Sequence, residues 1–197
     1  IIGHPQDYFL TKNTSATNGV FASIKGLSSS PDLAEKIGIE RDTALIRNLN
    51  IRYHADQVTT KIGLDVLRNV KATNNRITAG TSVHHLLFNE LDIGNYRTFF
   101  KLKPPLRSNA DREALTEAIR EGLIDNICSM HTPQDEESKR LPFEEAAPGA
   151  VGLETILPAS LSLYHNKILS LNQLFRLLAF NPANIIKKSL GCLDEGQ

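Results

Sequence analysis

The sequence is poor in several kinds of residue, and each shortage excludes a class of protein. It contains no tryptophan, one methionine, two cysteines and 6% aromatic residues among its 197 residues. The cysteines, Cys128 and Cys192, lie far apart and outside any metal-type pair, so they are too few for a disulfide scaffold. We therefore expect reduced thiols in a cytoplasmic protein.

An excess of charge of one sign is also lacking. Lys plus Arg number 22, as do Asp plus Glu, so the formal net charge is zero. This balance gives no electrostatic reason to expect a nucleic-acid partner. No apolar stretch approaches the roughly 20 residues that span a bilayer, and no signal peptide is visible. The sequence begins without methionine in an apolar run, so we expect upstream residues to have been removed.

Short apolar segments alternate with amphipathic ones along the chain. The apolar segments predict strands at residues 1–4, 51–57, 77–81 and 124–130. The amphipathic segments predict helices that start after residue 30, at 60–73, after 108, at 153–164 and at 170–180. Residues 99–103 are expected to be extended, and 132–145 to form a polar loop.

Several local signals place the ends of these helices. Ser30 and Pro31 suit the start of the first helix, with an apolar face formed by Leu33, Ile37, Ala44, Leu45 and Leu49. Ser108 and Asp111 are close to a capping box, and Gly122 is placed to end that helix. Pro182 is expected to end the helix at 170–180.

Alternating strands and helices predict an α/β fold with a parallel sheet, in one domain over residues 1–197. Four such units make half of a (β/α)₈ barrel, which typically takes about 250 residues. Half a barrel leaves two open sheet edges, so we expect this segment alone not to be a stable monomer. The other half could lie elsewhere in the same protein, which we favour, or come from a second copy or another subunit.

Six segments, in order along nearly the whole chain, resemble the dihydroorotases of the amidohydrolase superfamily. They are His4-Pro5-Gln6-Asp7, Arg52 to Thr60, Val83-His84-His85-Leu86-Leu87 with Lys103-Pro104-Pro105-Leu106-Arg107, Ser129 to Gln134, Lys139 to Ala146, and Gly149 to Thr155. The resemblance implies the carboxyl-terminal half of a TIM barrel of the metal-dependent hydrolase type, without its amino-terminal strands and carboxyl-terminal tail. It also implies zinc chemistry that interconverts carbamoyl aspartate and dihydroorotate in pyrimidine biosynthesis.

The resemblance assigns roles to single positions, and several of these positions have changed. His4 keeps a metal-ligand histidine, whereas Gln57 stands where a second ligand histidine would be. Met130 stands where the family has the aspartate that serves as metal ligand and general base. A thioether neither accepts a proton near neutral pH nor suits zinc that carries water. We therefore identify no catalytic residue, and we expect zinc to be weakly bound or absent.

The positions that would contact substrate are also altered. Lys103 replaces an asparagine, Gln134 replaces a histidine, and Arg107 is kept. His131 is kept too, and it would contact the metal ligands without binding the metal itself.

For each of these residues a purely structural interpretation competes with the functional one. His4 could be a satisfied strand-end histidine, His131 could lack a role near the metal, and Lys103 could be a solvated lysine. Structural roles are favoured for a further set of polar residues: His54, His84, His85, Asp7 and Asp56, with Glu136 and Glu137 in an exposed loop. That loop is expected to be exposed up to Lys139 and then anchored by Leu141 and Phe143.

Three functional hypotheses follow. The first is a non-catalytic dihydroorotase homologue with a structural or regulatory role, homo-oligomeric and associated with aspartate transcarbamoylase, as some family members are. The second is an active zinc amidohydrolase with a rebuilt site and another amide substrate. The third is an ordinary dihydroorotase in which the rest of the protein compensates.

Overall fold

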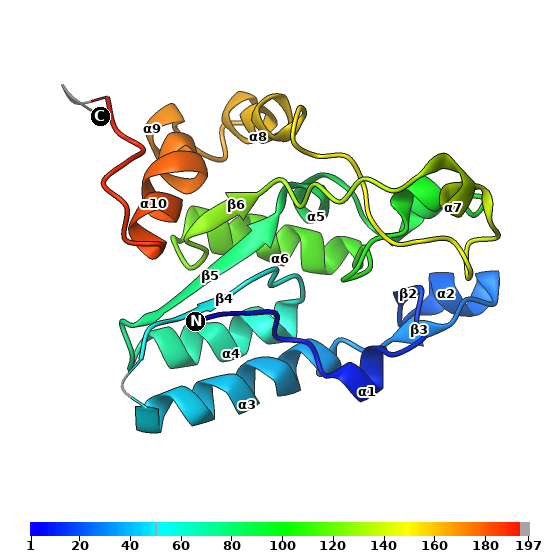
Figure 1. Ribbon diagram of the computed structural model, residues 1–197, viewed down its shortest axis with the longest axis horizontal. Helices are drawn as coiled ribbons and strands as arrows, with labels where there is room; N and C mark the ends of the chain where they lie inside the picture. The colour runs from blue at the N-terminus through cyan, green and yellow to red at the C-terminus, as the bar shows by residue number, and fades with distance from the viewer. Residues whose placement is uncertain (50, 194–197) are drawn as a thin grey trace.

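Four parallel strands form the main sheet of this protein, seen in a computed structural model that describes residues 1–49 and 51–193 (Figure 1). The strands are β1 (Ile2–Gly3), β4 (Tyr53–Ala55), β5 (Ile77–Ser82) and β6 (Asn126–Cys128). Their spatial order is β1-β4-β5-β6, so each strand lies beside the next one along the chain. This parallel order confirms the four predicted strands and places all their carboxyl ends at one edge.

Helices follow the strands, as expected for repeated strand–helix units. α3 (Leu33–Leu49), α4 (Lys61–Lys71) and α6 (Asn109–Arg120) follow the first three strands, and α3 packs on α4 and α4 on α6. The predicted capping box of α6 is confirmed by reciprocal hydrogen bonds between Ser108 and Asp111. Gly122 follows α6 with φ 76°, a left-handed conformation in which glycine is unstrained.

The last part of the chain packs helices beyond β6. These are α8 (Ile156–His165), α9 (Leu171–Phe175), the π-helical turn η3 (Arg176–Phe180) and α10 (Asn181–Ile185). The prediction that Pro182 ends the helix is wrong, because Pro182 lies in the first turn of α10, where its missing N–H is not needed. The expected extended segment at 99–103 is wrong in part, because η2 (Thr98–Phe100) is a 3₁₀ turn.

The buried face of α3 differs from the predicted one. Leu33, Leu45 and Leu49 are 47–60% exposed, whereas Glu35 and Ile39 are fully buried. The face is chosen by tertiary contacts: a side chain in place of the glycine at position 38 would collide with the backbone at residues 5–6. Helical spacing of apolar residues alone therefore selected the wrong side of this helix.

Between β1 and α3 the chain forms a small lobe that was not predicted. It holds α1 (Tyr8–Thr11), α2 (Val20–Lys25) and a two-stranded parallel sheet of β2 (Ala16–Thr17) and β3 (Ser29–Ser30). Figure 1 shows this lobe set apart from the main sheet, close to α7 (Glu136–Arg140). A separate small apolar cluster, which includes Ala16, Leu27 and Phe143, holds it to the rest of the chain.

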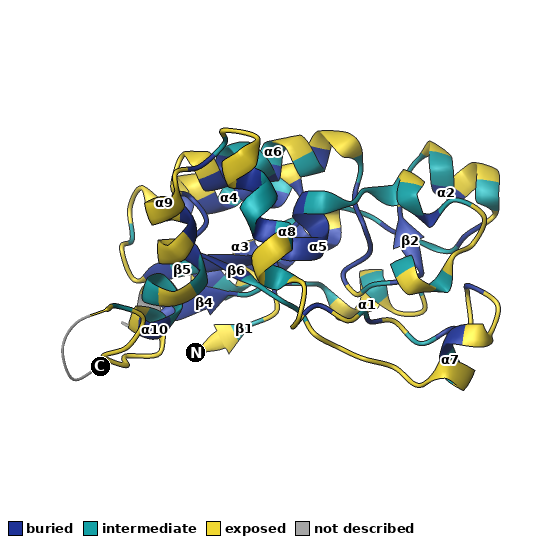
Figure 2. Cartoon of the chain, turned by 90° about the horizontal axis from the view of Figure 1, so that it is seen from above, coloured by how far each residue is buried: buried dark blue, intermediate teal, exposed yellow. Residues whose placement is uncertain are grey.

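The main core lies between the sheet and its helices. Figure 2 shows that β4 and β5 are largely buried and that α4 is buried along one side, while β1 is exposed. Leu64, Leu67, Ile77 and Leu115 are among its fully buried side chains, each stabilising the fold by roughly 1.5–3 kcal/mol. Across the residues that the structure describes, no helix is both long and apolar enough to cross a membrane.

The polar segment at 132–145 is only partly as expected. It contains α7, and Lys139 is 8% exposed rather than solvated. The predicted anchor Leu141 is 44% exposed, whereas the predicted anchor Phe143 is buried at 3% exposure. The Lys139 side chain is buried, and its ammonium group donates a hydrogen bond to the backbone carbonyl of Thr98 at 3.0 Å.

Candidate functional site

The carboxyl ends of β1 and β4 bring the first two predicted ligand positions to one edge of the sheet. Gly3 pairs with Ala55, so His4 follows at the same level as Asp56 and Gln57. His4 and Lys103 line one small cavity, and this proximity was not evident from their separation in the sequence. His4 is exposed as a residue, but the surrounding protein removes water from its ring, and this desolvation lowers its pKa. The negative charge of Asp56 raises the same pKa by a smaller amount.

The backbone is left-handed at two of the predicted ligand positions, as it also is at Asn13, Tyr96 and Lys167 among other non-glycine residues. Gln57 has φ 59° and Met130 has φ 44°, both in the left-handed region that residues other than glycine seldom adopt. Such conformations gather at functional sites in proteins. Gln57 is 9% exposed, and its amide nitrogen donates to the Asp56 carboxylate at 3.4 Å. At these two positions the strand ends present an amide and a thioether in place of an imidazole and a carboxylate.

The residues after β6 are tied to a later segment of the chain. His131 is exposed, and its Nδ1 accepts hydrogen bonds from the backbone N–H groups of Gly152 at 3.2 Å and Leu153 at 3.1 Å. Gln134 lines a second, larger cavity, apart from the small one lined by His4 and Lys103. The structure therefore places Gln134 and Lys103, two of the predicted substrate positions, in separate cavities.

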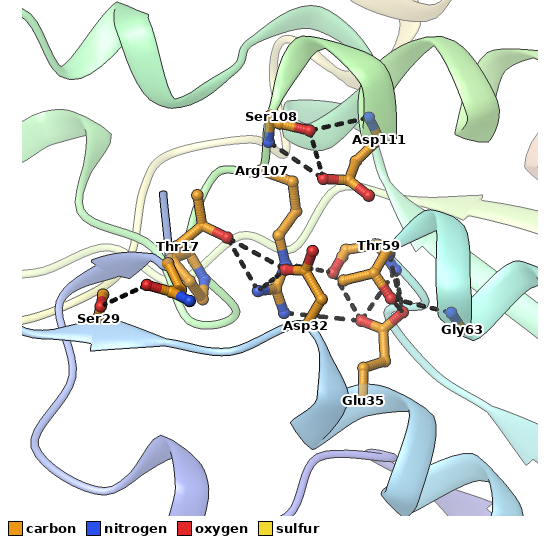
Figure 3. A network of polar contacts seen from close by, with 12 residues as sticks. Thr17, Ser29, Asp32, Glu35, Thr59, Gly63, Arg107, Ser108 and Asp111 are labelled. Carbon is orange, nitrogen blue, oxygen red and sulfur yellow. Dashed lines mark hydrogen bonds and ion pairs between the residues drawn. The ribbon is translucent and has the colours of Figure 1, made fainter. Parts of the chain in front are cut away.

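Arg107 lies in a buried polar network rather than in either cavity (Figure 3). It is 2% exposed, and its Nε donates to Thr59 Oγ1 at 3.0 Å. Its Nη1 lies 3.3 Å from Thr17 Oγ1 and 3.4 Å from Asp32 Oδ1, and its Nη2 lies 3.8 Å from Glu35 Oε2. In this arrangement the guanidinium holds the small lobe and α3 against the β4 strand end.

Glu35 is the residue that sequence reasoning missed. Its fully buried carboxylate accepts hydrogen bonds from the backbone N–H and the hydroxyl of both Thr59 and Thr60, at 2.6–3.1 Å. Gln6 donates to it as well, at 2.9 Å. Glu35 thus joins the loop after His4 to the turn after Gln57. No local signal marks it, because it reads as an ordinary helix glutamate.

Polar side chains also meet on the strands themselves. His54 Nδ1 lies 2.9 Å from Thr78 Oγ1, and burial lowers the pKa of His54. A Cβ at Gly80 would lie 2.5 Å from Asn126 Oδ1 and 3.0 Å from His54 Nε2. Glycine on β5 therefore leaves room for these two side chains to approach from the neighbouring strands.

The remaining singled-out residues have structural contacts. His84 and His85 lie in α5 (Val83–Leu87), both buried, and His85 Nε2 is 3.1 Å from the Pro105 carbonyl oxygen. Asp7 caps α1 by accepting from the Leu10 N–H at 3.1 Å. Glu136 and Glu137 are exposed, in the first turn of α7 rather than in a loop.

The donor groups at the strand ends do not suit zinc by themselves. Zinc in proteins takes cysteine, histidine and carboxylate ligands. The three predicted ligand positions offer one imidazole, an amide and a thioether, and the Asp56 carboxylate lies beside them. Within residues 1–49 and 51–193, no three His, Cys, Asp or Glu side chains lie close enough together to hold a metal ion.

Comparison with known proteins gives a consistent result. The dihydroorotase of Ehrlichia canis is 38% identical over 194 residues, 98% of this chain and 43% of that protein. The dihydroorotase of Listeria innocua is 38% identical over 200 residues, covering 100% of this chain and 46% of that protein. The chain thus spans less than half the length of these curated relatives. No protein-family model matches it.

Solved structures show the same fold. The L-hydantoinase (dihydropyrimidinase) of Arthrobacter aurescens superposes with a TM-score of 0.86 at 24% identity, over 100% of this chain and 46% of that one. The dihydropyrimidinase of Brevibacillus agri gives 0.85 at 17% identity, over 100% and 45%. The chain is therefore similar in sequence to dihydroorotases, and its α/β fold is similar to that of about half of each of these two solved structures.

Proposed function

We propose that this chain belongs to a dihydroorotase-like protein of pyrimidine metabolism whose zinc site is degraded and whose role is structural or regulatory. The observation that carries the proposal is the set of groups at the strand ends. His4 is the one metal-binding imidazole kept there, while Gln57 directs its amide nitrogen to Asp56 and Met130 offers a thioether.

The chemistry explains why these replacements matter. Hydrolysis of a cyclic amide needs a metal to activate water and a base to take up its proton. The Met130 thioether neither suits zinc that carries water nor accepts a proton near neutral pH. Loss of a general base typically lowers a reaction rate by roughly 10²–10⁴. Arg107 is also 2% exposed and surrounded by Thr59, Thr17, Asp32 and Glu35, so its guanidinium is not presented to a substrate at the surface.

A partner is part of this proposal. Non-catalytic dihydroorotase homologues associate with aspartate transcarbamoylase, and the resemblance extends that expectation to this chain, together with homo-oligomerisation. Co-purification of the full-length protein with aspartate transcarbamoylase from the same organism is the direct check.

A second candidate is an active zinc amidohydrolase with a rebuilt site. The observation in its favour is the left-handed backbone at Gln57 and Met130, a conformation that occurs at functional sites in proteins. In this case ligands from the rest of the protein, together with His4, would hold the metal.

Metal analysis of the full-length protein separates the two candidates. After dialysis against a mild chelator, we expect far less than one zinc per chain and no turnover of dihydroorotate, carbamoyl aspartate or hydantoins. The dihydroorotase of Listeria innocua, treated identically, is the positive control. About one zinc per chain with turnover of any of these amides would replace the first proposal by the second.

A further inference from the structure

The small lobe contains the one Asn-Gly pair of the sequence, Asn18-Gly19. Asn18 directly follows β2 and Gly19 directly precedes α2, so the pair links these two elements. Asn18 is exposed, and the backbone of Gly19 is extended, with φ 169°. Because glycine has no side chain to shield its backbone nitrogen, this nitrogen can approach the side-chain amide carbon of Asn18. A bond between the two atoms would close a five-membered ring.

The side-chain amide of Asn18 is held against the neighbouring strand. Its Oδ1 accepts a hydrogen bond from the hydroxyl of Ser29, the first residue of β3, at 3.4 Å. A donor on a carbonyl oxygen stabilises the negative charge that develops there when a nucleophile attacks the carbon. The contact therefore favours attack on Cγ of Asn18.

A carboxylate from a distant segment lies against Gly19. Glu90 is the first residue of η1 (Glu90–Ile93), and its Oε2 would lie 3.5 Å from a Cβ atom placed on Gly19. This Oε2 is buried and has no hydrogen-bond partner among the residues that the structure describes. Burial, followed by the negative charges of Asp111 and Asp32, raises the pKa of Glu90. A carboxylate that is a stronger base than usual thus lies beside the Gly19 backbone.

We propose that Asn18 is a site of spontaneous deamidation, in which Glu90 accepts the proton of the attacking Gly19 nitrogen. The Gly19 nitrogen forms a bond to Cγ of Asn18 and transfers its proton to the Glu90 carboxylate. The bond from Cγ to the side-chain nitrogen then breaks, and that nitrogen takes the proton back from Glu90 and leaves as ammonia. One water molecule hydrolyses the resulting succinimide to aspartate or isoaspartate.

The product would change the small lobe at a structural position. The Asn18 backbone N–H donates to the Ser30 carbonyl at 2.9 Å, next to the paired residues of β2 and β3. Isoaspartate adds one carbon atom to the main chain at this point. Both products also add a negative charge one residue after Thr17, whose hydroxyl donates to Asp32 at 3.3 Å. The proposal does not depend on His4, Gln57 or Met130, so it stands or falls separately from the proposed function.

The test follows the full-length protein during incubation at mildly alkaline pH. Trypsin releases residues 13–25 as one peptide that contains both Asn13 and Asn18, and fragment masses distinguish deamidation at the two positions. Asn13 is also exposed but precedes Thr14, so it is the reference within the same peptide. We expect Asn18 to react at least about tenfold faster than Asn13, because ring closure and a positioned base both raise the rate. Equal rates at Asn13 and Asn18 would overturn the proposal.

Variants then test the two reacting partners. Gly19→Ala should slow the reaction of Asn18 by about tenfold or more, because the methyl group shields the attacking nitrogen. The extended backbone accepts alanine, whose Cβ would make an ordinary contact with Glu90. Glu90→Gln keeps the shape but removes the base, and it should slow Asn18 about tenfold without affecting Asn13. Glu113→Gln removes an exposed carboxylate and is the matched control.

A comparison of native and unfolded wild-type protein keeps the test decisive if Glu90→Gln does not fold. Only the folded chain places Glu90 beside Gly19, since 71 residues separate them in the sequence. We therefore expect Asn18 to react faster in native protein than in protein unfolded by urea. A slower reaction in the native protein, or an unchanged rate in folded Glu90→Gln, would show that Glu90 does not act as the base.

Discussion

Replacing Glu35 by alanine is expected to destabilise the protein more than any surface substitution. The substitution removes a fully buried carboxylate that accepts hydrogen bonds from Thr59, Thr60 and Gln6. It also removes the negative charge nearest to Nη2 of the buried Arg107, at 3.8 Å. The backbone N–H groups of Thr59 and Thr60 would then have no acceptor in a buried site.

The magnitude follows from these contacts. A buried donor left unsatisfied costs about 1–3 kcal/mol, and a buried ion pair broken on one side costs about 3–5 kcal/mol. The two effects overlap at Glu35, and water entering the vacated space offsets part of them, so we expect about 4 kcal/mol for Glu35→Ala. That is a large part of the 5–15 kcal/mol by which proteins of this kind are typically stable. Glu35→Gln, which keeps the shape and one acceptor oxygen, should cost about half as much.

Urea denaturation of the full-length protein measures this difference. Glu40→Gln on the same helix is the control, because the Glu40 carboxylate is 52% exposed and 3.9 Å from Lys36, and such pairs contribute less than about 1 kcal/mol. A double-mutant cycle with Arg107→Met should show coupling between Glu35 and Arg107. If the free energy of unfolding of Glu35→Ala lies within about 1 kcal/mol of the wild-type value, the network does not stabilise the β4 strand end.

Three further outcomes are expected. Gln57→His combined with Met130→Asp should recover zinc binding, measured by elemental analysis, before it recovers turnover, because Lys103 and Gln134 still misplace substrate; dihydroorotase rates from Met130→Asp alone would contradict this. Limited trypsin digestion, followed by mass spectrometry, should cut after the exposed Arg140 and not after the buried Lys139. Complete burial lowers the pKa of His85 from 6.5 to about 3, so between these pH values the unfolded state binds a proton that the folded state does not bind. The free energy of unfolding should therefore fall with decreasing pH by up to about 1.4 kcal/mol per pH unit from this residue. His85→Gln should flatten that slope.

Much of the fold could be predicted because its signals are local. The four strands are short apolar runs. The start of α6 is marked by Ser108 and Asp111, whose side chains accept hydrogen bonds from backbone N–H groups three residues away. Such contacts depend on neighbours in the chain and are present in the sequence itself. The order of strand-end motifs likewise placed His4, Gln57 and Met130 at the ends of their strands.

Other features depended on residues far apart in the chain, and no local pattern revealed them. Leu33 and Leu45 have the spacing of a buried face, yet Glu35 and Ile39 are the buried residues, because Thr59 and Thr60 supply the donors that a buried carboxylate needs. Such long-range partners override helical periodicity.

The candidate site shows the same division. Residue types at positions 4, 57 and 130 were readable from the sequence, whereas the left-handed backbone at Gln57 and Met130 was not. The sequence around Lys139 predicts a solvated loop lysine. In the structure its side chain is buried and donates to the carbonyl of Thr98, 41 residues away in the chain. Chain neighbours set the strands and caps, while burial, charge pairing and the left-handed backbone at the site arise only when distant segments pack together.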